Sequence, residues 1–181
     1  MAIKPTIYKC RISLSDLNRD YYDSLNLTVA QHPSETLNRM IVRVLAYCLN
    51  AQEGLAFTKG LSAIEEPDIW LRTLDDQTQL WIEIGEPDPD RIKKASHIAQ
   101  TVMVYTFNSK SKDWWAKTEP KLSSLNVSVI QLVPDEVSAL AALVQRTMDF
   151  SVTISGDTLY ISTALGECEL LYTVLRQQAQ D

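Results

Sequence analysis

The chain has 181 residues, of which 45% are hydrophobic, and a net charge of −6 at neutral pH. A chain of this length is expected to form one domain with a sizeable core. It has no run of about 18 apolar residues, so no membrane association is expected, and its start lacks the apolar stretch of a secretory signal peptide. The three cysteines show no CxxC spacing, which favours reduced thiols in a cytoplasmic protein.

Charge is unevenly distributed along the chain. Residues 51–90 carry ten acids against two basic residues, whereas residues 91–121 carry seven basic residues against two acids. The simplest interpretation is a solvated surface of mixed charge. The alternative is an acidic, metal-holding site beside a wall that faces phosphate groups.

The first part of the chain combines strands with one helix. Alternating apolar and polar residues predict strands at 3–14 and 23–30. From residue 34 to residue 50, apolar residues recur at helical spacing and predict a strongly apolar helix, with Ser34 suited to its start. A short strand is expected at 54–61.

The rest of the chain alternates strands and helices. The apolar, β-branched and aromatic run at 101–107 is typical of a strand buried on both faces, and a helix capped by Asp88 or Asp90 precedes it. The other expected elements are a hairpin at 67–85, a short helix over Trp114 and Trp115, a strand at 125–133, a helix at 134–145, and strands at 146–155, 157–163 and 167–175. The central order of helix, three strands, helix and strand predicts an α/β or α+β protein with a mixed sheet.

The hairpin PDIWLRTLDDQTQLWIEIG has a register that follows from its turn. If the turn centres on Asp75 and Asp76, alternate side chains fall on opposite faces. One face is amphipathic and carries Asp68, Trp70, Arg72, Gln79, Trp81 and Glu83. The other is expected to face the core and carries Ile69, Leu71, Thr73, Leu80, Ile82 and Ile84.

Asp68 and Glu83 lie opposite each other in this register. Their Cβ atoms would be roughly 5 Å apart, where two carboxylates repel. A divalent cation between the two carboxylates would turn this repulsion into a favourable interaction. Mg²⁺ is usually held by one or two carboxylates, waters and substrate phosphates. The alternative is that Asp68 sits at a frayed strand end and binds water or Arg72.

Two further clusters leave alternatives open. Arg39 follows Glu35 by four residues on the predicted helix, and this spacing indicates either a helix ion pair or an arginine that orients the carboxylate. Lysines surround Trp114 and Trp115. Such interleaving suits nucleic-acid binding, whereas a tryptophan pair can equally anchor the core under a loop.

Five segments together resemble the YaeQ family of bacterial proteins: HPSETLNRMIVRVLAY, LAFTKGL, EPDIWLR, LWIEIGEPDPDRIKKAS and VYTFNSK. The resemblance covers nearly the whole chain. That family is similar in fold to the PD-(D/E)XK nucleases, which have a four-stranded mixed sheet between helices. The resemblance therefore implies a single domain, 1–181, with a restriction-endonuclease-like αβββαβ core at about 33–133, extended by β-strands at 3–30 and 146–175.

The nuclease signature can be placed on this sequence residue by residue. Its two acids fall on Asp68 and Glu83, and the lysine expected two positions later is replaced by Gly85. Some nucleases supply that lysine from the following helix, and the resemblance implies that Lys93 and Lys94 take this catalytic role.

Glu35 matches the place of an additional acidic ligand in many such nucleases. The implied metal site holds Mg²⁺ or Mn²⁺ through Asp68, Glu83 and Glu35. The implied activity is divalent-metal-dependent phosphodiester hydrolysis in nucleic-acid processing, in which the metal acidifies a bound water. The alternative is a catalytically inactive protein of the same fold, related to transcription, that binds nucleic acid or a protein partner.

Overall fold

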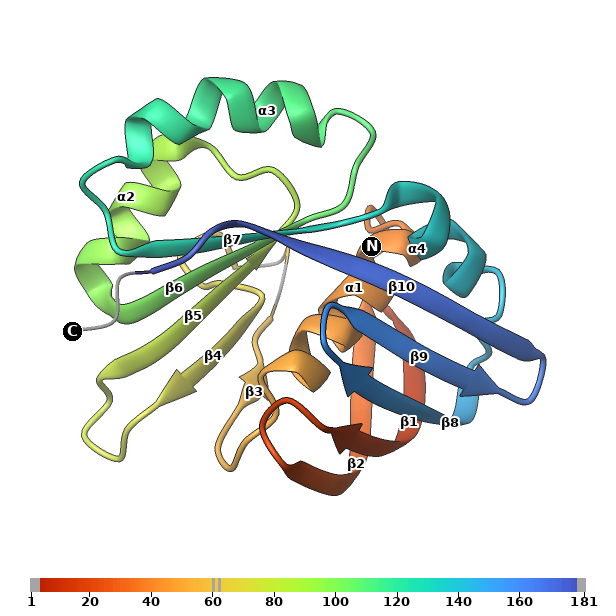
Figure 1. Cartoon of the computed structure of the whole chain (residues 1–181). Coiled ribbons are helices and arrows are strands. Elements are labelled where there is room, and N and C mark those ends of the chain that lie inside the picture. The colour runs from red at the N-terminus through yellow and green to blue at the C-terminus, as the bar shows by residue number, and fades with distance from the viewer. Residues whose placement is uncertain (1–3, 60, 62, 179–181) are drawn as a thin grey trace. The chain divides into compact units, whose positions relative to one another are not determined.

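The computed structural model describes residues 4–59, 61 and 63–178, and Figure 1 shows its helices and strands. The chain divides into two compact units. The first contains Met1–Leu49 and Val133–Tyr172, and the second contains Asn50–Leu132 and Thr173–Asp181. The chain thus leaves the first unit after Leu49, builds the second and returns at Val133.

The first unit is built on a sheet whose strands alternate between buried and exposed residues. In β1 (Thr6–Asp16), Cys10 and Ile12 are buried whereas Arg11 and Ser13 are exposed. The strand order is β2 (Tyr21–Gln31), β1, β8 (Thr147–Ser155), β9 (Thr158–Thr163) and β10 (Gly166–Arg176). The β1–β8 pair is parallel and the other pairs are antiparallel. The two N-terminal and three closing strands predicted from the sequence are confirmed.

Two helices belong to the first unit and contact each other. In α1 (Leu37–Leu49), eight of thirteen residues are buried, so the helix is apolar on most sides. Its Asn38 donates from Nδ2 to Ser138 Oγ of α4 (Pro134–Ala141) over 2.9 Å. In the described part of the chain, no helix is both long and apolar enough to cross a membrane.

The second unit is a mixed sheet with helical crossovers. The strand order is β3 (Ala56–Phe57), β4 (Ile69–Arg72), β5 (Thr78–Ile84), β6 (Ala99–Thr106) and β7 (Val127–Leu132), with the end of β10 beside β7. The pairs β3–β4 and β4–β5 are antiparallel, whereas β5–β6 and β6–β7 are parallel. Parallel neighbours need a crossover. The first crossover is α2 (Pro89–Ile98), and the second contains α3 (Ser111–Thr118) and the 3-10 helix η2 (Glu119–Leu122).

The helices α2 and α3 cover one face of this sheet (Figure 1). The core between them and the sheet contains Trp81, Ile92, Ala95, Ala99, Val102, Val104, Leu122, Val127 and Val129. Trp114 and Trp115 pack against it with ring centres 6.0 Å apart, and Trp114 Nε1 donates to Pro87 O over 2.9 Å. These contacts confirm the interpretation of the two tryptophans as core anchors.

The hairpin register is confirmed next to the candidate carboxylates. Trp70 pairs with Trp81, and the neighbouring pairs also agree with the prediction. A bulge follows Leu71, so that Arg72 pairs with Thr78 instead of Gln79. The face with Trp81 is amphipathic, as predicted: Arg72 and Gln79 near the turn are exposed, whereas Asp68, Trp81 and Glu83 are buried. Trp81 is buried because it packs with Ile92 and Ala95 of α2, a helix that the sequence of the hairpin alone does not reveal.

The expectation of a restriction-endonuclease-like αβββαβ core flanked by helices is wrong. The described residues form ten strands and four α-helices, a structure dominated by strands. Moreover, α1 belongs to the first unit, with β1, β2, β8 and β9, whereas β3 to β7 belong to the second. The expectation failed because α1 is apolar on most sides. Its sequence therefore identifies a buried helix but not the strands that it packs against.

Candidate functional site

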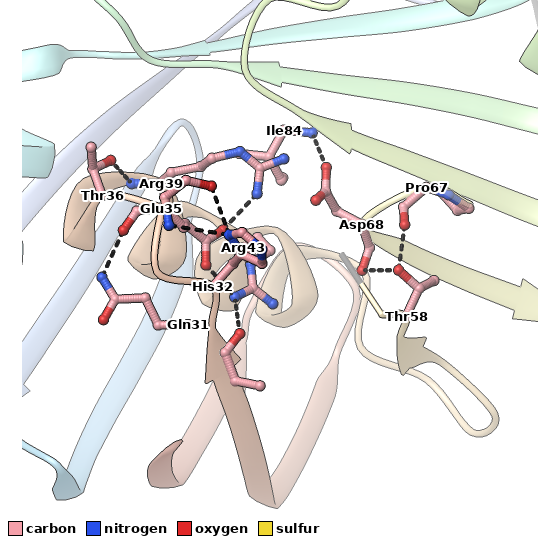
Figure 2. Close-up of polar contacts among 12 residues, drawn as sticks. Gln31, His32, Glu35, Thr36, Arg39, Arg43, Thr58, Pro67, Asp68 and Ile84 are labelled. Carbon is pink, nitrogen blue, oxygen red and sulfur yellow. Dashed lines mark hydrogen bonds and ion pairs between the residues drawn. The ribbon is translucent and has the colours of Figure 1, made fainter. Parts of the chain in front are cut away.

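Asp68 and Glu83 lie side by side in the second unit, as the hairpin register predicts. The amide of Asp68 donates to Ile82 O over 3.0 Å and extends the strand pairing by one residue beyond β4. Asp68 Oδ2 accepts the amide N–H of Ile84 over 2.8 Å (Figure 2). The two carboxylate residues are only 3% and 5% exposed. The alternative of a frayed, solvated Asp68 is therefore wrong.

The backbone before Asp68 is also fixed. Thr58 donates its amide to Asp68 O over 3.2 Å, and its hydroxyl donates to Pro67 O (Figure 2). Arg72, the other suggested partner of Asp68, instead pairs with Asp76 at the hairpin turn over 3.4 Å. The position of the Asp68 carboxylate is thus set by strand pairing on both sides of β4.

Glu83 is held by two donors on a single oxygen. Its Oε1 accepts Trp81 Nε1 over 2.9 Å and Arg91 Nε over 2.8 Å. Arg91 also donates to Ile64 O over 2.5 Å and to Glu66 O over 2.8 Å. Glu83 Oε2 accepts no hydrogen bond from the part of the chain that the structure describes. One oxygen of Glu83 is therefore fixed, and the other remains available to a ligand.

Arg91 was not among the residues predicted from the sequence. It lies in the first turn of α2 and pairs with Glu83 across the segment 64–66. The only signal for it was its position in the basic block that follows the acidic one. Its partner depends on how α2 packs on β5, and charge spacing alone does not give that.

The environment raises the pKa of Glu83 above its ordinary value. Burial of the carboxyl group is the largest cause and the charge of Asp68 the second. The Arg91 guanidinium and the Trp81 N–H act in the opposite direction but do not reverse the shift. Two ionised carboxylates in this place therefore cost folding free energy.

This shift predicts a pH-dependent effect of Glu83→Gln. Because the folded pKa is raised, the native protein loses stability as pH rises through the unfolded and then the folded pKa. Glutamine keeps both hydrogen bonds but does not ionise. We expect the stability of the variant relative to the native protein to increase as pH rises above about 4.5, the ordinary pKa of glutamate, as measured by urea unfolding. A constant difference, equal to that of the neighbouring control Glu86→Gln, would contradict the assignment.

The two predicted lysines lie on the exposed side of α2. Lys94 Nζ pairs with Glu65 Oε2 over 3.1 Å, and both side chains are mostly exposed. Lys93 is also exposed. Among the described residues, the cation in contact with Glu83 is Arg91, and neither lysine joins the carboxylate pair. A catalytic role for Lys93 or Lys94 stays a prediction.

Gly85 occupies the position of the expected lysine for a backbone reason. Its φ is +111°, outside the region that side-chain-bearing residues readily adopt. Its amide donates to Tyr105 O over 2.8 Å, which ties the end of β5 to β6. A lysine here would have to adopt this strained conformation.

We expect Gly85→Ala to lower the free energy of unfolding by about 1–3 kcal/mol. A Cβ at this position would meet no atom within 4 Å, so the loss would come from backbone strain alone. Urea unfolding of the variant measures it. As a control, Gly156→Asn should cost less, because φ at Gly156 is +60°, which asparagine tolerates. Equal losses would contradict the assignment of strain to φ at Gly85.

Glu35 belongs to the first unit and is bound by two arginines (Figure 2). Arg43 donates from Nε to Oε2 over 2.9 Å and from a terminal nitrogen to Oε1 over 2.6 Å, and Arg39 reaches Oε2 over 2.6 Å. Glu35 is 6% exposed. The geometry shows the ion pair of Glu35 with Arg39 at the predicted spacing of four residues, although Glu35 precedes the first residue of α1. The role of Glu35 as a metal ligand stays a prediction, with both its oxygens engaged by guanidinium groups.

The carboxylate pair of the second unit suits a small divalent cation. Within residues 4–59, 61 and 63–178, no group of three or more metal-ligating side chains comes together. One or two carboxylates together with waters are nevertheless what proteins usually offer to Mg²⁺. The donors present thus fit Mg²⁺ or Mn²⁺, and they do not fit a closed zinc site.

Comparison with known sequences decides the family. The model of the YaeQ protein family matches residues 1–172. The chain belongs to the YaeQ family. The uncharacterized YaeQ protein of Escherichia coli K12 is 39% identical over 179 residues, covering 98% of this chain and 99% of that protein. The corresponding protein of Salmonella typhi is 40% identical with the same coverage. The family predicted from the sequence is thereby confirmed.

Two crystal structures of YaeQ proteins have the same fold. The protein from Xanthomonas axonopodis pv. citri superimposes with a TM-score of 0.93 at 36% identity, covering 97% of this chain and 99% of that one. The protein from Pseudomonas syringae gives 0.92 at 36% identity, covering 96% and 97%. The strand-dominated architecture is therefore shared with solved members of the family.

Proposed function

We propose that this YaeQ protein is a divalent-metal-dependent phosphodiesterase that acts on nucleic acid, with Asp68 and Glu83 as the metal ligands. The observation that carries the proposal is the pair of buried carboxylates, with the pKa of Glu83 raised by burial and by Asp68. A pair that repels itself inside the protein costs stability. Such pairs concentrate at functional sites, where a cation or substrate offsets the cost.

The surrounding residues support a positioning role around this pair. The amide of Ile84 orients Asp68, while Trp81 and Arg91 orient Glu83 through Oε1. When bound, Mg²⁺ or Mn²⁺ would polarise a phosphoryl oxygen and lower the pKa of a water.

Arg91 also places a fixed positive charge beside Glu83, which would offset the charge of the phosphate group. Lys93 and Lys94, exposed on the same helix, would attract the phosphate backbone.

The test is hydrolysis of single-stranded DNA and RNA by the purified full chain in Mn²⁺ and in EDTA. We expect cleavage in Mn²⁺ that EDTA abolishes. Cleavage at equal rates in Mn²⁺ and in EDTA would remove the proposal. No cleavage in Mn²⁺ would remove it as well.

A second candidate is a binding protein without hydrolytic activity, whose partner is nucleic acid or another protein. The observation that favours it is Gly85 at the lysine position, together with the ion pair that engages Glu83 through Arg91. This candidate predicts salt-dependent oligonucleotide binding, or a stable protein complex, with no cleavage in Mg²⁺ or Mn²⁺. Metal-dependent cleavage lost in Glu83→Gln would eliminate it.

A further inference from the structure

A pocket of about 270 Å³ opens between α2, the segment before β4 and residue Trp81 of β5. It lies wholly within the second unit. Its lining combines apolar and charged residues: Ile64, Glu65, Trp81, Asp90, Arg91, Lys94, Ala95 and Ile98. Pockets of small ligands are usually apolar with a few convergent polar groups. The volume of this pocket is close to the lower limit of their size range, which is about 300 Å³. It has room for one ring system.

The apolar walls of the pocket are partly open to solvent. Ile64 is 79% exposed and Ile98 is 51% exposed. Trp81, by contrast, is buried and contributes an aromatic wall held by its hydrogen bond to Glu83. Exposed isoleucines beside a fixed tryptophan form a surface that an apolar, planar group would cover.

The pocket shares two walls with the carboxylate site. Trp81 and Arg91 line the pocket, and both also donate to Glu83 Oε1. A ligand in the pocket is thus separated from Glu83 by the side chains that orient it. Lys94, which also lines the pocket, carries a second positive charge at the rim and pairs there with the exposed Glu65 over 3.1 Å.

We propose that this pocket binds the base of a single nucleotide, with the attached phosphate directed to Arg91 and Lys94. The proposal rests on the proposed phosphodiesterase function, which supplies the phosphate. A base has a flat face for the apolar walls and for stacking on indole or guanidinium groups. In a duplex the base is stacked and paired, so the substrate is a single strand or an extruded nucleotide.

The acids of the lining give a preference among bases. Glu65 and Asp90 are carboxylates that accept hydrogen bonds but cannot donate them when ionised. Adenine, cytosine and guanine carry exocyclic amino groups that donate two N–H bonds to such acceptors, whereas uracil offers only its ring N–H. The pocket therefore prefers adenine and cytosine over uracil.

The test is calorimetric binding of mononucleotides to the full chain in EDTA, so that the readout is independent of hydrolysis. We expect AMP and CMP to bind at least about tenfold more tightly than UMP, ribose 5-phosphate or hexyl phosphate, which corresponds to about 1.4 kcal/mol. Equal affinity for AMP and ribose 5-phosphate would overturn a base site. Equal affinity for hexyl phosphate would assign the pocket to an aliphatic chain instead.

Matched variants locate the binding. Ile98→Glu should weaken AMP binding about tenfold, while Leu74→Glu, at the fully exposed hairpin tip, should leave it unchanged. Lys94→Ala should weaken it and Lys121→Ala should not, because Lys94 lines the pocket whereas Lys121 is exposed in η2, outside the lining. Unchanged affinity in Ile98→Glu and Lys94→Ala would overturn the proposal. If AMP binds here and no nucleic acid is cleaved in Mn²⁺, the phosphodiesterase assignment fails while the base pocket stands.

Discussion

Replacing Glu35 by alanine is expected to lower the free energy of unfolding by about 3–5 kcal/mol, the usual cost of removing one partner of a buried ion pair. Glu35 accepts from Arg39 and Arg43, and the Arg43 side chain is only 4% exposed. The substitution would leave two guanidinium groups without their carboxylate inside the first unit. Arg43 would keep its hydrogen bond to Ala30 O, so the loss comes from the bonds to Glu35 that water cannot replace there at low cost.

Urea unfolding of Glu35→Ala and of a surface control measures this effect. Asp149→Ala removes the partner of Arg11 in an ion pair whose side chains are both 72% exposed, and should cost less than about 1 kcal/mol. A loss below about 1 kcal/mol in Glu35→Ala would contradict the structural role of the cluster.

Glu83→Gln and Asp68→Asn are expected to lower metal-dependent cleavage by at least about 100-fold, because partners that only orient a ligand already account for about 10–100-fold. Both variants preserve the shape of the side chain and remove one ligand charge. Glu83→Gln should lower cleavage without loss of stability near neutral pH. The ionised carboxylate of Glu83 itself costs folding free energy in the native state.

Initial cleavage rates in Mn²⁺, with Glu86→Gln as the control, test these two variants. Glu86 lies two residues after the end of β5 and outside the pair, and its carboxylate accepts from Ser111 Oγ over 3.3 Å. Loss of activity in step with loss of folding would indicate a structural role. Rates within about twofold of the native protein would exclude both carboxylates as ligands.

The hairpin and its carboxylate pair could be predicted from the sequence because the information is local. The turn at Asp75–Asp76 and the alternation of side chains fix the register up to the bulge at Leu71. The ion pair of Glu35 with Arg39 follows equally from their spacing of four residues, although Glu35 lies just before α1. In each case the partners are set by backbone periodicity.

The errors concern features that depend on tertiary packing. The strongly apolar sequence of α1 indicates burial but not the unit in which the helix is buried, and the expected nuclease-like core depended on that choice. Arg91 was missed because its pairing with Glu83 requires α2 to lie over β5. Gly85 was interpreted as a missing lysine, whereas its positive φ gives the glycine a backbone role that no side chain pattern reveals.

The most direct test of the central claim is calorimetric titration of Mn²⁺ into the native protein and into the double variant Asp68→Asn/Glu83→Gln. We predict one binding site per native chain and no measurable site in the variant, with far-ultraviolet circular dichroism unchanged. Mn²⁺ binding of equal affinity and stoichiometry to both proteins, or no binding to the native protein, would contradict the assignment of this pair as a metal site.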